Sequence, residues 1–186
     1  MNPHRTIFPS PFRRVSRLFV NSWMLILAAT AANGADILSE GFATLTAVAP
    51  PAGWTSSTAS DLAYSNAPFV GAASPAYKFK TTGQSLTSPT FATGAANLQF
   101  WAYGNGGAGT MAVSGLVSGA WTLVDTTSIA ANSATYQVTL NPQTTQIKFT
   151  FIKNTNHCAF DDVVVQGAGE DPNLSAPASL AFGAIA

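Results

Sequence analysis

Hydrophobic and polar residues alternate along most of the chain between residues 37 and 166. The clearest example is residues 146–151, where Ile147, Phe149 and Phe151 alternate with glutamine, lysine and threonine. Successive side chains of a β-strand point to opposite faces, so a period of two predicts strands with one buried face. Because no helical period lasts more than two turns, the chain is expected to be all-β. The expected strands lie at 37–45, 76–80, 85–91, 97–103, 110–114, 120–128, 136–140, 147–151 and 159–166.

Turn-forming sequences separate these segments, for example Pro-Pro-Ala-Gly at 50–53 and the glycine-rich stretch 104–109. Proline and glycine in such clusters mark turns and loops. Short strands in quick succession are typical of sandwich and jelly-roll folds. We therefore expect residues 36–169 to form an antiparallel jelly-roll β-sandwich of about eight or nine strands.

Residues 1–35 are expected to be a signal peptide, not part of the fold. The segment carries all four arginines of the chain, an apolar stretch of ten residues at 23–32, and small residues after it. The alternative is a membrane anchor, but ten helical residues rise only ~15 Å, about half of the bilayer core. The pair Arg13-Arg14 also leaves a twin-arginine signal open. The mature protein is then secreted or at the cell surface, with no stable membrane span.

Charge and cysteine content exclude several classes of function. Without the first 35 residues the chain keeps four lysines and eight acidic residues, a net charge of −4, and no arginine. Nucleic-acid binders carry clustered basic residues, so no nucleic-acid partner is expected. Cys158 is the only cysteine and cannot form an intrachain disulfide. It is either buried or paired with another molecule, and its place beside the apolar last strand favours burial.

Aromatic residues on one expected strand could form a sugar-binding platform. Trp101 and Tyr103 share a face, with Gln99 before them and Asn105 after them. Flat rings pack on sugars, and side-chain amides bind hydroxyl groups, so Trp101, Tyr103 and Asn105 are the candidate ligand-binding residues. The alternative is that both faces of the strand are buried, one in the core and one under a loop. Two weaker candidates are Trp54 and Trp121.

The last expected strand contains two adjacent carboxylates, Asp161 and Asp162, in an apolar run. In a regular strand they point to opposite faces, so one of them needs a buried partner. A bound cation or a group of backbone N–H donors would serve. Opposite faces are a poor geometry for an acid–base pair, and Asp61 and Asp125 lie in separate polar stretches. No enzymatic activity is therefore expected.

Three ordered pieces resemble a known family. They are residues 39–42 with 50–55, residues 86–89 with 98–101, and residues 160–165. Together they resemble jelly-roll modules of secreted bacterial multidomain proteins, of the cleaved-adhesin and choice-of-anchor type, and more distantly MAM domains. The resemblance covers residues 37–167, but the cysteines of MAM domains are absent. Residues 170–186 look like a linker and the first strand of a truncated immunoglobulin-like repeat.

The resemblance implies an extracellular adhesion or carbohydrate-binding module, with a glycan or a cell-surface component as partner. In related jelly rolls a structural cation joins the first and last strands. The matching residues are Glu40, Asp161 and Asp162, which implies a structural Ca²⁺ held by these three metal ligands. The alternative is that an aspartate caps a turn and Glu40 is solvated. Such an ion would serve stability, not catalysis.

Three hypotheses about function follow. The first is a secreted, non-catalytic adhesion or carbohydrate-binding accessory module. The second is the N-terminal spacer domain of a larger secreted hydrolase, such as a nuclease or phosphatase, whose catalytic part is not in this chain. The third is a structural surface domain without a small ligand.

Overall fold

The computed structural model describes residues 34–107 and 109–169, and within them every regular element is a β-strand. None of these residues forms a helix that could cross a membrane. Most of the expected signal peptide and all of the expected C-terminal repeat segment lie outside the described residues. The strands are β1 (Asp36–Glu40), β2 (Thr55–Ser56), β3 (Ala63–Tyr64), β4 (Ala76–Phe79), β5 (Ser85–Thr87), β6 (Ala95–Gly104), β7 (Gly109–Val117), β8 (Ala120–Ile129), β9 (Ser133–Thr139), β10 (Thr144–Lys153) and β11 (Cys158–Gly167).

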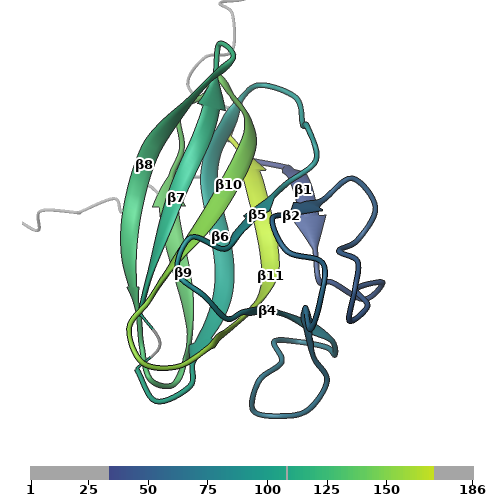
Figure 1. Ribbon diagram of the computed structural model, residues 1–186. Coiled ribbons are helices and arrows are strands. Elements are labelled where there is room, and N and C mark those ends of the chain that lie inside the picture. The colour runs from purple at the N-terminus through teal and green to yellow at the C-terminus, as the bar shows by residue number, and fades with distance from the viewer. Residues whose placement is uncertain (1–33, 108, 170–186) are drawn as a thin grey trace, which may run out of the picture. The chain divides into compact units, whose positions relative to one another are not determined.

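The strands form two antiparallel sheets (Figure 1). The six-stranded sheet has the order β3-β4-β11-β6-β9, and β1 also pairs with β11. The five-stranded sheet has the order β2-β5-β10-β7-β8. The predicted all-β sandwich is therefore confirmed, and a strand is present in each of the nine expected places. Strands β2 and β3 were not predicted, because two residues are too few to show a period.

The core between the two sheets is built from the aromatic residues that the alternation pattern places on one face. Phe160 of β11 is fully buried at its centre. Its ring centroid lies 5.3 Å from that of Phe100 in the same sheet and 4.6 Å from that of Phe149 in the opposite sheet. Phe42 and Phe79 also pack against it, at 6.0 and 5.5 Å. Since both sheets contribute, the core fixes how they are stacked.

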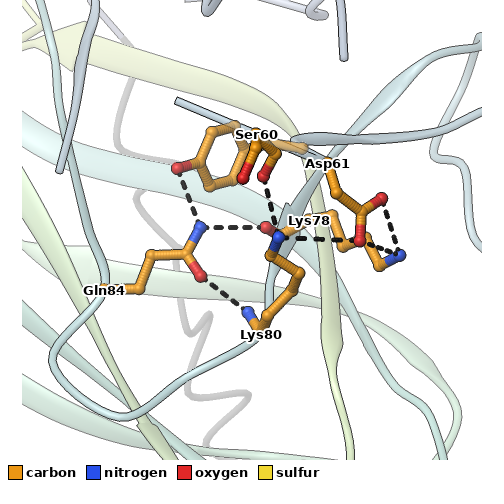
Figure 2. A network of polar contacts seen from close by, with 6 residues as sticks. Ser60, Asp61, Lys78, Lys80 and Gln84 are labelled. Atoms are coloured by element: carbon orange, nitrogen blue, oxygen red, sulfur yellow. Dashed lines mark hydrogen bonds and ion pairs between the residues drawn. The ribbon is translucent and has the colours of Figure 1, made fainter. Parts of the chain in front are cut away.

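A polar network supports the crossover from β4 in one sheet to β5 in the other (Figure 2). Gln84 is almost fully buried, and its Nε2 donates to Tyr77 Oη at 3.1 Å and to the Lys78 carbonyl oxygen at 3.0 Å. Gln84 Oε1 accepts from the Lys80 backbone N–H at 2.7 Å. On the surface, hydrogen bonds from Lys78 hold the pKa of Asp61 below its usual value. The network is a structural support, since its central amide has its hydrogen-bonding groups satisfied.

Candidate functional site

The candidate site lies on the outer face of the six-stranded sheet, on the central strands β6 and β11. Along β6, Leu98, Phe100 and Ala102 are fully buried in the sandwich. The alternating residues therefore point to the outer face, as expected from the sequence. These are Asn97, Gln99, Trp101 and Tyr103, and all of them are at least partly exposed.

Side-chain amides surround a small hollow on this face. The hollow measures about 130 Å³, and its lining residues come from β6, β9 and β11: Asn97, Leu98, Gln99, Gln137 and Gln166. Gln137 Nε2 donates to Gln99 Oε1 at 3.4 Å, and Gln166 Nε2 donates to Asp36 Oδ1 at 3.2 Å. Ligand pockets that enclose drug-sized molecules have volumes of roughly 300–1,000 Å³. A ligand of that size would therefore lie on this amide hollow and not be enclosed by it.

Trp101 and Tyr103 lie side by side next to the amide hollow, but their surroundings differ. Their ring centroids are 6.4 Å apart and the rings are nearly parallel, at 22°. Phe69 packs edge-on against Tyr103 at 5.2 Å and stacks on Tyr64 at 4.9 Å. A loop residue thus packs on Tyr103, but Tyr103 stays partly exposed. Trp101 is also partly exposed, and among the described residues the ring that packs beside it is that of Tyr103.

The other candidates from the sequence lie elsewhere. Asn105 is exposed in the loop after β6, and its backbone N–H donates to the His157 carbonyl oxygen at 3.3 Å. Trp54 is buried against Phe42, so it belongs to the core. Trp121 is 40% exposed but lies on β8 of the other sheet. The amides at 137 and 166 were missed, because only strand pairing shows that they flank Gln99.

The two aspartates of β11 occupy a β-bulge. Asp161 pairs with Trp101 of β6, and the next paired residue, Val164, lies opposite Gln99. The strand β11 therefore has one more residue in this interval than β6 has. Asp162, inside the bulge, has a φ of 48°, in the left-handed region that aspartate tolerates better than most residues. A bulge of this kind re-aims side chains and breaks their alternation.

Both carboxylates consequently bind one loop, residues 65–75. Asp161 Oδ2 accepts from the Gly71 N–H at 2.9 Å, and Asp162 Oδ2 accepts from the Ala72 N–H at 2.8 Å. The expectation that the two aspartates point to opposite faces is wrong, because the bulge interrupts the regular strand between them. Of the two partners proposed for the buried carboxylate, backbone N–H groups are the ones observed.

Burial has the largest effect on the pKa of Asp161, one of the two carboxylates that bind the loop 65–75. The side chain of Asp161 has no exposed surface, and burial raises its pKa to about 6. Hydrogen bonds from the N–H groups of Gly71 and Asp162 oppose this shift, whereas the nearby charges of Asp162 and Glu40 add to it. Glu40 Oε1 itself accepts from the Phe42 N–H at 2.6 Å. The donors therefore stabilise a charge that burial disfavours.

The calcium hypothesis involves the same three carboxylates. Their oxygen atoms are the ligand type that Ca²⁺ prefers. Among the residues that the structure describes, however, no three histidine, cysteine, aspartate or glutamate side chains form a group that could hold a metal ion. Both oxygens of Asp161 already accept backbone N–H groups. Ca²⁺ at Glu40, Asp161 and Asp162 stays a prediction.

The remaining titratable residue of interest is Cys158. It is fully buried, in agreement with the preference for burial expected from its sequence position. Burial raises the pKa of its thiol to about 12. The thiol is therefore protonated at neutral pH and shielded from solvent, and neither property suits a nucleophile.

No protein-family profile and no curated protein sequence matches the chain. Among solved structures, the K3 cleaved adhesin domain of Lys-gingipain (Kgp) from Porphyromonas gingivalis W83 is similar, with a TM-score of 0.57 and 15% identity over 72% of this chain and 100% of that domain. The K1 domain of the same protein has a TM-score of 0.56 and 17% identity over 73% and 100%.

A third similar structure is that of TmCBM61, solved in complex with β-1,4-galactotriose. Its TM-score is 0.50 and its identity is 18%, over 71% of this chain and 98% of that one. At such low identities the similarity shows a common fold and no more. The described residues therefore have the jelly-roll β-sandwich fold found in adhesin and carbohydrate-binding modules, as the resemblance in the sequence implied.

Proposed function

We propose that this domain is a non-catalytic binding module and that the outer face of its six-stranded sheet binds a glycan. The observation that carries the proposal is the position of a partly exposed tryptophan, Trp101, beside the amide hollow. An indole ring supplies a flat apolar surface for one face of a sugar ring. The four amide side chains around the hollow supply donors and acceptors for hydroxyl groups.

The chemistry of the face supports a neutral ligand. The amide hollow is lined by uncharged residues, and amides can both donate and accept hydrogen bonds, as sugar hydroxyls also do. Two carboxylates lie near the hollow: Asp36 is bonded to Gln166, and Asp161 is covered by the loop 65–75. No cation stands in this hollow to select an anionic ligand.

The test is binding of the purified protein to a panel of soluble polysaccharides, namely β-1,4-galactan, xylan, mixed-linkage β-glucan and mannan, and to β-1,4-galactotriose. Galactan and its trisaccharide are included because TmCBM61, of similar fold, was solved with the trisaccharide. Trp101→Ala is expected to weaken binding by at least about tenfold, or about 1.4 kcal/mol, since buried aromatic anchors dominate binding.

Trp121→Ala is the matched control, because it removes an exposed tryptophan from the other sheet. It should leave the affinity unchanged. Binding that is lost equally in both variants, or no binding to any glycan of the panel, would contradict the proposal. The secreted or cell-surface location expected from the sequence is tested separately, by fractionating cells that express the full chain.

A further inference from the structure

The loop 65–75 lies beside Trp101, where it limits the directions in which a bound glycan chain can extend. It lies on the outer face of the six-stranded sheet and is held there by Asp161 and Asp162 through two backbone N–H groups. Residues 65–68 and 72–74 are exposed. The loop packs on Tyr103 through Phe69 and binds Asp161 through Gly71, so it forms a barrier on two sides of Trp101.

The barrier closes one direction along β6. From Trp101, the next residue on the same face toward the end of the strand is Tyr103. The ring of Phe69 packs against Tyr103 with a centroid separation of 5.2 Å and an interplanar angle of 89°. A sugar chain stacked on Trp101 therefore meets the Phe69 ring when it is extended toward Tyr103.

The same loop closes one direction across the sheet. In the strand register, Trp101 lies between Thr135 of β9 and Asp161 of β11. Asp161 has no exposed surface, and Gly71 of the loop donates to its carboxylate. A sugar chain that crosses from Trp101 toward β11 therefore meets the backbone of the loop.

The two other directions are open. Along β6 in the opposite sense the face continues to Gln99 and the amide hollow. Across the sheet, Thr135 and Gln137 of β9 are both exposed, and β9 is the last strand on that side. Each straight path over Trp101, along β6 or across the sheet, is thus open at one end and closed at the other, so an extended chain cannot run straight through this position.

We infer that the loop 65–75 makes this a site for the end of a glycan chain: Trp101 receives the terminal sugar, and the following units lie on the amide hollow. The inference rests on the proposed glycan binding and adds the chain terminus as the recognised feature. Phe69 is the residue that sets this specificity, although it lies outside the hollow.

The experiment measures binding capacity against the number of chain ends. A polysaccharide of the panel that binds is cut partially with an endo-acting hydrolase, so that its mass stays constant while its ends multiply. Titration calorimetry of the wild-type protein then gives the moles of protein bound per gram. If the site recognises chain ends, the moles of protein bound per gram should rise in proportion to the number of ends. A trisaccharide of the same sugar should then compete completely with the polysaccharide for the protein.

Two outcomes separate this inference from the proposed function. A capacity that follows mass and not ends would overturn recognition of termini while leaving glycan binding intact. Absence of binding to every polysaccharide would overturn both. Phe69→Ala is expected to raise the capacity for the uncut polymer, because internal units gain access to Trp101. Asn66→Ala, in the same loop and exposed, is the control and should behave as wild type.

Discussion

Replacement of Gly71 by alanine tests the close approach of the loop 65–75 to the aspartate pair. A Cβ atom at residue 71 would overlap Asp162 Oδ2 and would lie 2.9 Å from Asp161 Cβ. Such contacts are too short to be tolerated, so the loop or both aspartates must move. Gly71 is not among the residues with positive φ, so the cost comes from the contact and not from backbone strain.

The magnitude follows from the hydrogen bonds that this movement breaks. The N–H groups of Gly71 and Ala72 donate to the two carboxylates at 2.9 and 2.8 Å. A hydrogen bond to a charged group contributes about 1.5–3 kcal/mol, and an exposed loop can recover part of that by hydration. We expect Gly71→Ala to lower the free energy of unfolding by about 2–4 kcal/mol. In a domain of this size that is a fall in the melting midpoint of roughly 5–15 °C.

The assay is urea unfolding followed by tryptophan fluorescence and far-UV circular dichroism. Gly41→Ala is the matched control, because its Cβ would make only an ordinary contact of 3.9 Å with Asp162 Oδ1. A double-mutant cycle with Asp162→Gly isolates the contact, since glycine keeps the positive φ and removes the carboxylate. In that background Gly71→Ala should cost at least about 1 kcal/mol less. Additive effects, or equal midpoints for the two alanine variants, would refute the close approach.

Three other predictions can be checked with the same protein. Phe160→Leu, at the centre of the aromatic core, should lower the free energy of unfolding by about 1–3 kcal/mol, whereas the exposed Val48→Ala should change it by less than about 0.5 kcal/mol; equal effects in urea unfolding would contradict the packing. The pKa of Cys158 is raised to about 12 in the folded state from 9.0, so its stabilising contribution is present below pH 9 and is lost as the pH rises toward 12. Wild type should therefore lose more stability between about pH 9 and pH 11 than Cys158→Ala, and parallel pH profiles would exclude this. A calcium ion at Glu40, Asp161 and Asp162 should raise the melting midpoint of the EDTA-treated protein on addition of millimolar Ca²⁺, and Glu40→Gln should abolish the rise; no rise means that backbone N–H groups alone hold the aspartates.

Most strands and their buried faces could be predicted from the sequence, because they depend on the alternation of residues within one short segment. Ile147, Phe149 and Phe151 are all fully buried, as their alternation indicated, and the outward direction of Trp101 follows from the same rule. Side-chain direction in a regular strand depends only on residue parity. The rule failed at Asp162, where a bulge inserts one residue and the parity changes.

The assembly of the site could not be predicted, because its parts are distant in the chain. Phe69 covers Tyr103, and Gly71 binds Asp161 across 90 residues. Equally, alternation could not say that Trp54 lies in the core and Trp121 on the opposite sheet. Those outcomes depend on which strands pair and in which register.

The sequence by itself thus determined an all-β domain, the places of nine of its strands, and a row of polar and aromatic residues on the outer face of one of them. Only the tertiary structure decided which residues share that face from neighbouring strands, which carboxylates meet, and which loop stands beside the tryptophan. The physical reason is that local alternation fixes the direction of each side chain, whereas neighbours are fixed by long-range packing and hydrogen bonding between strands.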